Sequence, residues 1–319
     1  MPMNRHLLGA LVAAPLLTPA AALACSSCGC TLASDWVTQG LTSKPGLRFD
    51  LRYDFIDQTQ LRSGTHAVDP ATIELPTDRE IERHTRNHYV TLGIDYSPND
   101  VWGVSVQVPY IDRYHTTIPE EETSLSESKS SALGDVKAVI RYQGFTANRN
   151  LGIELGLKLP TGPFRDTFRS GTEAGEPVDR GLQPGTGTTD ALIGIYQFGT
   201  LAGNWDYFVH GRAQVPLGSR QDYRPGVSFE ADAGLHYVGF EYVTPQLQLN
   251  LKTGGRDKGA EADTENSGGT LLYVGTGATV KISENLRFYG FVQVPVYQDV
   301  NGLQLEPKWI LTTGIHVSL

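Results

Sequence analysis

The chain has 319 residues, of which 39% are hydrophobic and 19% charged, and its formal net charge is −9 at pH 7. A bundle of membrane helices would be far more apolar, and a disordered chain would carry more charge and fewer aromatic residues. No block of basic residues occurs, so the composition also argues against a nucleic-acid partner.

The first 24 residues have the pattern of a signal peptide. Arg5 is followed by an apolar stretch at 7–17, and Ala22-Leu23-Ala24 has the small-x-small pattern of signal peptidase sites. An anchoring helix is the alternative, but two prolines interrupt the segment and it is short for a membrane span. The sequence therefore predicts secretion and cleavage after residue 24.

All three cysteines, Cys25, Cys28 and Cys30, lie in the next six residues as C-x-x-C-x-C. Closely spaced thiolates suit soft metals, so Cu(I) or Zn is one interpretation of the cluster. A small disulfide in the oxidising periplasm, with the third thiol free or Cys25 lipid-modified, is the other. We expect 25–45 either to be a periplasmic segment, which would dock a periplasmic protein, or to plug the lumen.

From residue 46 onward the sequence alternates apolar and polar residues with a period of two, which is typical of β-strands with two different faces. In one example, Leu247, Leu249 and Leu251 alternate with glutamines, an asparagine and a lysine. We count twelve such runs, at 46–56, 86–96, 101–112, 132–144, 150–160, 188–199, 204–217, 227–239, 243–254, 270–282, 285–297 and 304–318. Each is about as long as a tilted strand that crosses a membrane.

Short connections alternate with long ones along these runs. Together with the even strand number, this pattern predicts an all-β fold for 46–319, a twelve-stranded antiparallel transmembrane β-barrel. Its short turns would face the periplasm and its long loops the cell exterior. Aromatic residues near the run ends, such as Trp102 and Trp309, suit interfacial girdles. A soluble sandwich or barrel is the alternative.

Four of the runs end with a Val-Pro or Leu-Pro pair on the polar face, at Pro109, Pro160, Pro216 and Pro295. Proline cannot donate a hydrogen bond to the strand ladder. These positions are therefore predicted to be β-bulges or strand ends, and they either shape a constriction or only terminate the strands.

Several motifs resemble one family of outer-membrane proteins. They are Ala132-Leu133-Gly134-Asp135-Val136, Leu157-Lys158-Leu159-Pro160-Thr161-Gly162, Gln183-Pro184-Gly185-Thr186-Gly187-Thr188-Thr189-Asp190 and Gln293-Val294-Pro295-Val296-Tyr297-Gln298. The resemblance covers 45–319 and is to the transporter-like family named for the meta-pathway of phenol degradation. It implies uptake of an aromatic or other small molecule, and it carries over no substrate-binding residue. The aromatic C-terminus favoured in that family is replaced here by Leu319.

If the apolar faces meet lipid, the polar faces line the lumen. The predicted lining residues are Arg48, Asp50, Arg52, Asp54, Lys137, Arg141, Glu154, Lys158, Asp206, His210, Arg212, Glu230, Asp232, His236, Lys252, Lys281 and His316. So many charges must pair or stay hydrated. The two interpretations are a selective channel and a closed interior held by ion pairs.

Catalysis is not expected. The sequence has no G-x-S-x-G or H-E-x-x-H motif, and its histidines are predicted in the lumen or the long loops. The predicted function is an outer-membrane channel for a small solute, with outer-membrane lipid as its surroundings. The alternative is a metal-binding or partner-docking scaffold built on the three cysteines.

Overall fold

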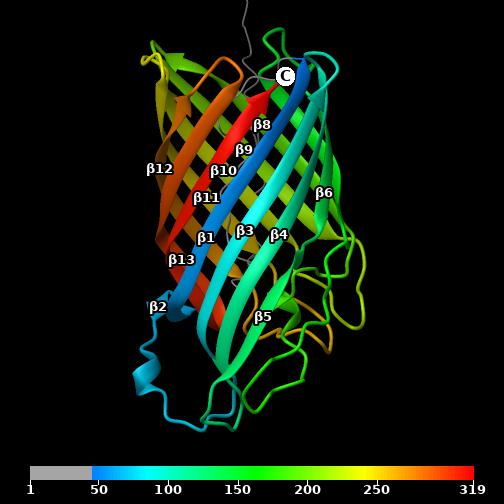
Figure 1. The fold of residues 1–319 in the computed structure, drawn as a ribbon, viewed down its shortest axis with the longest axis vertical. Helices are drawn as coiled ribbons and strands as arrows, with labels where there is room; N and C mark the ends of the chain where they lie inside the picture. Colours follow the sequence, from blue (N-terminus) through cyan, green and yellow to red (C-terminus); the bar gives the residue numbers. More distant parts are fainter. Residues whose placement is uncertain (1–44) are drawn as a thin grey trace, which may run out of the picture.

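The computed structural model describes residues 45–319, which form long antiparallel strands paired in chain order (Figure 1). No α-helix occurs in this range, and two single turns of 3-10 helix, η1 (Pro70–Thr72) and η2 (Arg180–Leu182), lie in connections. None of its helices is long and apolar enough to cross a membrane. The predicted signal peptide at 1–24 and the cysteine cluster with its metal lie outside the described residues.

Eleven strands close into a ring because β13 pairs with both β12 and β1, and β2 and β5 lie outside that ring. The strands are β1 (Gly46–Gly64), β2 (His66–Ala67), β3 (Ile81–Ser97), β4 (Trp102–Ile118), β5 (Ser126–Leu133), β6 (Val136–Tyr142), β7 (Leu151–Leu159), β8 (Asp190–Ala202), β9 (Trp205–Pro216), β10 (Ser228–Tyr237), β11 (Val243–Gly254), β12 (Gly269–Lys281) and β13 (Leu286–Ser318). A closed antiparallel ring leaves no unpaired edge.

The strand count differs from the sequence prediction at β13. The runs expected at 285–297 and 304–318 form one strand of 33 residues, whose first arm pairs with β12 and whose second arm pairs with β1. The Ser318 N–H donates to the Asn285 carbonyl at 2.9 Å, so the two arms lie side by side. Gly302, with φ of 56°, turns the chain between the arms. The turn is so tight that strand pairing continues through it.

The run expected at 132–144 is interrupted, and proline explains why. β4 pairs with β6 through its first part and with β5 through its second, and Pro109 lies between the two ladders. Pro109 has no N–H to donate, and its carbonyl instead accepts from Gly134 at 2.8 Å. Pro160 follows β7, Pro216 ends β9, and a register shift lies beside Pro295. The prediction of bulges or strand ends is therefore confirmed at Pro160, Pro216 and Pro295. It is wrong at Pro109, which lies within β4, and there the strand that pairs with β4 is interrupted instead.

The connections at one end of the barrel, the short-turn end, are 98–101, 143–150, 203–204, 238–242 and 282–285. Those at the other, the long-loop end, are 65–80, 119–125, 160–189, 217–227 and 255–268, and they lie at the bottom of Figure 1. The C-terminus lies at the short-turn end, where the Leu319 N–H donates to the Leu47 carbonyl at 2.8 Å.

The two faces of each strand differ in polarity, as the alternation predicts. On β11, Gln246 and Gln248 are buried inside the ring, whereas Leu247 and Leu249 are 51% and 48% exposed on the outside. The same outward apolar exposure occurs around the ring, at Leu51, Val90, Leu92, Val104, Ile140, Leu155, Ile193, Ile195, Val209, Val292, Val294 and Ile315. The interior is polar and the outer surface is an apolar belt.

Beyond this belt, at the long-loop end, a separate apolar cluster is buried. Leu61, Ile81, Ile118 and Leu305 pack together and against Val68, Ile73 and Leu75 of loop 65–80. Other positions there are polar and exposed, as at Arg86. These strands therefore extend past the belt, and loop 65–80 packs against their ends.

Candidate functional site

The predicted lining residues all lie on the inner side of the strands or at its edges, with different degrees of burial. Arg48, Arg52, Asp54, Arg141, Glu154, Lys158, His210, Asp232, His236 and His316 are buried. Asp50, Lys137, Asp206, Arg212, Glu230, Lys252 and Lys281 are half-buried. They do not form one cluster but several along the barrel axis.

The cluster nearest the short-turn end is centred on Asp95 of β3. Its carboxylate pairs with Arg48 of β1, and its other oxygen lies 2.8 Å from Nη2 of Arg141 on β6. Arg48 also donates to Oγ of Ser97 at 2.6 Å. One carboxylate therefore binds two buried guanidinium groups that come from strands on either side of β3 and β4. Asp206, His236 and Lys281 lie apart from it, around a separate cavity of about 210 Å³.

A second cluster is centred on His210 of β9. Its Nδ1 lies 3.3 Å from Asp232, and its Nε2 lies 3.4 Å from Glu154, which also accepts from Nη2 of Arg212 at 2.8 Å. Asn250 donates to the other oxygen of Asp232 at 2.7 Å. Opposite charges alternate through this network, which lets buried ionisable groups satisfy one another.

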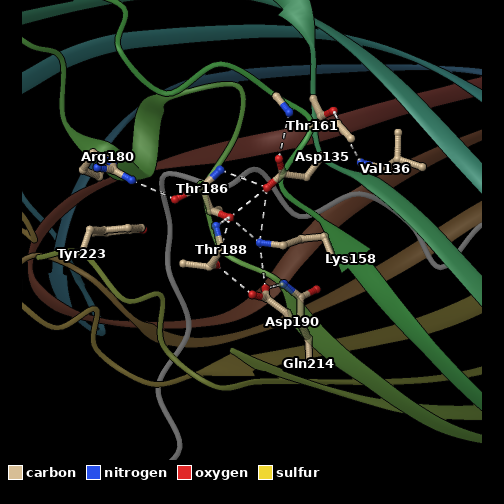
Figure 2. Close-up of polar contacts among 12 residues, drawn as sticks. Asp135, Val136, Lys158, Thr161, Arg180, Thr186, Thr188, Asp190, Gln214 and Tyr223 are labelled. Carbon is tan, nitrogen blue, oxygen red and sulfur yellow. Dashed lines mark hydrogen bonds and ion pairs between the residues drawn. The ribbon is translucent and has the colours of Figure 1, made fainter. Parts of the chain in front are cut away.

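The third cluster joins the barrel wall to loop 160–189 (Figure 2). Nζ of Lys158 lies 2.7 Å from Asp190 and 3.3 Å from Asp135. Asp135 accepts from the N–H groups of Gly162 at 3.0 Å and Thr186 at 2.9 Å. The carboxylate thus holds both ends of the loop against the wall.

Loop 160–189 carries Arg180, which lies against the aromatic rings of Phe164 and Tyr223 at 4.5 and 4.8 Å from their centroids. Such stacking is a cation–π contact. Arg113 of β4 donates to the carbonyl of Leu182, so the wall also holds η2 in place. Loop 160–189 therefore positions two arginines, Arg180 within the loop and Arg113 through its contact with Leu182.

These groups surround a cavity of about 240 Å³. Its polar lining combines wall residues and loop residues, and its apolar lining includes Tyr89, Pro109, Ile111, Pro184 and Pro225. Arg52, Lys137, Lys158, Glu230 and Lys252 are the predicted lining residues that reach it. A cavity with cationic and apolar walls can bind a small solute with both characters.

Sequence reasoning missed Asp95, Arg113, Asp135, Arg180 and Asp190 as interior residues. Asp95 alternates with exposed Tyr96, so the sequence pattern indicates that the Asp95 side chain points inward. Asp135 and Asp190 fall within the motifs that carry the family resemblance, and their contacts explain those motifs structurally. Arg180 lies in a long loop, where no periodicity indicates a direction.

An acidic pocket occupies the long-loop end and is lined by five carboxylates, those of Glu80, Glu82, Asp179, Asp257 and Asp263. Burial, with the nearby charge of Asp263, raises the pKa of Asp179 to about 6. Burial likewise raises the pKa of Glu80, and the charge of Asp179 adds to it. Within 45–319, no group of three or more His, Cys, Asp or Glu side chains has the arrangement to hold a metal ion.

These raised pKa values predict a pH-dependent stability of the long-loop end. Because the pKa of Asp179 is higher in the folded state than in the unfolded state, protonation of Asp179 stabilises the fold. This contribution is complete below about pH 4 and is lost as the pH rises through about 6. We expect amide hydrogen exchange in loop 160–189 to be slower at pH 5 than at pH 8, after correction for intrinsic rates. Asp179→Asn should reduce this difference, by about 1–3 kcal/mol at most.

Asp78→Asn is the matched control because the Asp78 side chain is 85% exposed in the neighbouring loop 65–80. It should leave the pH dependence unchanged. Equal exchange protection at both pH values in the parent chain would contradict the prediction.

No protein-family model and no curated protein matches the chain. Among solved structures, an outer membrane channel from Pseudomonas putida F1 is similar with a TM-score of 0.63 and 12% identity, covering 86% of this chain and 96% of that one. The transport unit of the autotransporter AIDA-I from Escherichia coli is similar with a TM-score of 0.53 and 10% identity, covering 92% and 95%. At these identities the likeness shows the fold of an outer-membrane barrel, and the phenol meta-pathway resemblance stays a prediction.

Proposed function

We propose that this chain is an outer-membrane channel that passes a small solute through the barrel interior. The observation that carries the proposal is the polarity of the closed ring, with charged groups inside and an apolar belt outside. A soluble barrel would bury its apolar side chains, and monomeric soluble proteins seldom expose a continuous apolar surface of this extent. A membrane accepts a barrel because every backbone group pairs within the ring.

The topology of the proposed channel follows from the two arms of β13. If each arm crosses the membrane separately, twelve segments span it, which is an even number, as in bacterial barrels of this kind. The short-turn end then faces the periplasm and the long-loop end the exterior. A cleaved signal peptide at 1–24 would provide export. Cavities bounded by polar walls would provide a water-filled path.

Conductance in a planar lipid bilayer tests the proposal. The purified full-length chain should give discrete single-channel steps in potassium chloride, and candidate solutes should reduce the current. A folded barrel that never conducts would contradict the channel function. Folding is checked independently by the shift in electrophoretic mobility between unheated and boiled samples.

The belt can be tested by placing a charge in it. Ile193 of β8 is 53% exposed and pairs with Leu155 at the middle of β7. Ile193→Arg should lower the free energy of unfolding in lipid vesicles by ~2–4 kcal/mol, because arginine would face hydrocarbon. Urea unfolding followed by tryptophan fluorescence measures the change.

Leu125→Arg is the matched control. Leu125 is 49% exposed but lies in loop 119–125, outside the belt, so its replacement should change stability by no more than about 0.5 kcal/mol. Equal stability of the Ile193 variant and the parent would mean that this face meets water.

A further inference from the structure

The cavity between loop 160–189 and the barrel wall has an excess of positive charge. Six cationic side chains line it, from Arg52, Arg113, Lys137, Lys158, Arg180 and Lys252, against three carboxylates, from Asp135, Glu230 and Asp257. The whole chain, in contrast, carries a net charge of −9. The cationic lining is therefore local and does not follow from the composition.

The carboxylates of this cavity already have partners. Asp135 accepts from two loop N–H groups and pairs with Lys158. Asp257 accepts from the Tyr223 hydroxyl at 2.7 Å and from the Gly226 N–H at 2.8 Å. Glu230 lies opposite Lys252 in the β10–β11 ladder and opposite Arg212 in the β9–β10 ladder. Glu230 is also the carboxylate whose charge acts on Lys137. The cavity still has three more cationic than anionic side chains.

Arg113 and Arg180 donate hydrogen bonds only to uncharged groups among residues 45–319 and form no ion pair there. Arg113 donates to Asn87 Oδ1 at 2.6 Å, to the Tyr89 hydroxyl at 2.7 Å and to a backbone carbonyl. Arg180 donates to the Thr186 carbonyl at 2.8 Å, and its buried Nε has no hydrogen-bond partner. Both guanidinium groups are at most 9% exposed.

Lys137 differs from the two arginines, because the charge of Glu230 acts on it. Its side chain is half-buried and makes no direct hydrogen bond or ion pair with a described residue. Buried charges in proteins are normally paired, because an uncompensated one is costly. Two buried arginines without a carboxylate partner, together with the excess of cationic over anionic side chains on one cavity, therefore indicate an anionic ligand.

The rest of the lining indicates what else the ligand carries. Tyr89, Tyr223, Pro109 and Ile111 give the cavity apolar walls. Guanidinium groups bind planar carboxylates through two parallel hydrogen bonds, and a lysine adds a point charge. We propose that this cavity is a binding site for a small organic carboxylate, held by Lys137, Arg113 and Arg180. The inference rests on the proposed channel function, to which it adds the class of solute.

Equilibrium binding tests the site without requiring conduction. Titration calorimetry of the detergent-solubilised full-length chain with benzoate should give saturable binding, and benzamide, its uncharged analogue, should bind at least tenfold more weakly. Lys137→Gln should weaken benzoate binding about tenfold. Because Lys137 makes no direct hydrogen bond or ion pair with a described residue, this variant should fold as the parent does. Arg180→Gln should have a similar effect.

Lys258→Gln is the matched control, since Lys258 is exposed in loop 255–268 and does not line the cavity. It removes one positive charge from the same end of the barrel and should leave benzoate affinity unchanged. Equal binding of benzamide, no loss in Lys137→Gln, or equal loss in Lys258→Gln would each overturn the inference. Inorganic phosphate binding as tightly as benzoate would overturn its organic part.

Bilayer recordings separate this inference from the channel proposal. A potassium chloride gradient should give a reversal potential on the anion-selective side, and benzoate should block the chloride current less effectively in Lys137→Gln. Discrete steps with cation selectivity and no benzoate block would overturn the carboxylate site and leave the channel intact. Benzoate binding without any conductance would support the site and contradict the channel.

Discussion

Replacing Asp95 with alanine is expected to lower the free energy of unfolding by ~3–5 kcal/mol, because two buried arginines lose the carboxylate that they share. Arg48 and Arg141 reach Asp95 from strands on either side of β3 and β4, and all three residues are at most 6% exposed. In a low-dielectric interior, removal of one partner leaves the full desolvation cost of the others. Urea unfolding in lipid vesicles, followed by tryptophan fluorescence, measures the loss.

Two further variants separate charge from packing. Asp95→Asn keeps the shape of the side chain and should retain most of the loss. Asp100→Asn removes a carboxylate at the neighbouring short turn, where Asp100 and Arg149 are 3.5 Å apart and both exposed. An exposed pair contributes about 0–1 kcal/mol, so this control should remain close to the parent. A similar loss in Asp95→Ala and Asp100→Asn would show that burial of the cluster does not matter.

The alternation of residues predicted the strands well where one face meets the apolar belt. For β11, the expected and observed bounds coincide at 243–254. Three strands extend further than expected, since β1 ends at Gly64, β3 begins at Ile81 and β4 ends at Ile118. In these extensions Leu61, Ile81 and Ile118 pack against loop 65–80 instead of facing lipid, so the pattern that identifies a lipid-facing strand is lost while strand pairing continues.

The candidate site was less predictable than the fold. The period of two assigns a side chain such as Glu154 or His210 to the inner face, because alternate residues share a face. It does not indicate which inner residues meet, since that depends on the register between strands and on the barrel radius. The contributions of Arg180 and Asp179 come from long loops, whose path is set by tertiary contacts such as those of Asp135.

Replacing Lys158 with methionine is expected to release loop 160–189 from the wall and to destabilise the barrel by ~3–5 kcal/mol. Lys158 is 4% exposed and is the cation between Asp190 and Asp135 (Figure 2). Without it, two buried carboxylates lie near each other with no shared counter-charge. Asp135 is also the acceptor for Gly162 and Thr186, so repulsion there acts directly on both anchors of the loop.

Trypsin reports the release separately from global unfolding, because Arg165 and Arg169 are exposed in the loop. Cleavage there should be at least tenfold faster in Lys158→Met, while the barrel keeps its electrophoretic mobility shift. The double variant Lys158→Met, Asp190→Asn should recover part of the resistance because it restores the charge balance.

Lys129→Met, which removes an exposed lysine 3.6 Å from Asp112, is the control and should be cleaved at the same rate as the parent. Unchanged cleavage in Lys158→Met would mean that other contacts hold the loop, such as that of Arg113 with Leu182. If the loop does open, Arg180 leaves the cavity with it, so the same variant should raise conductance and weaken benzoate binding together.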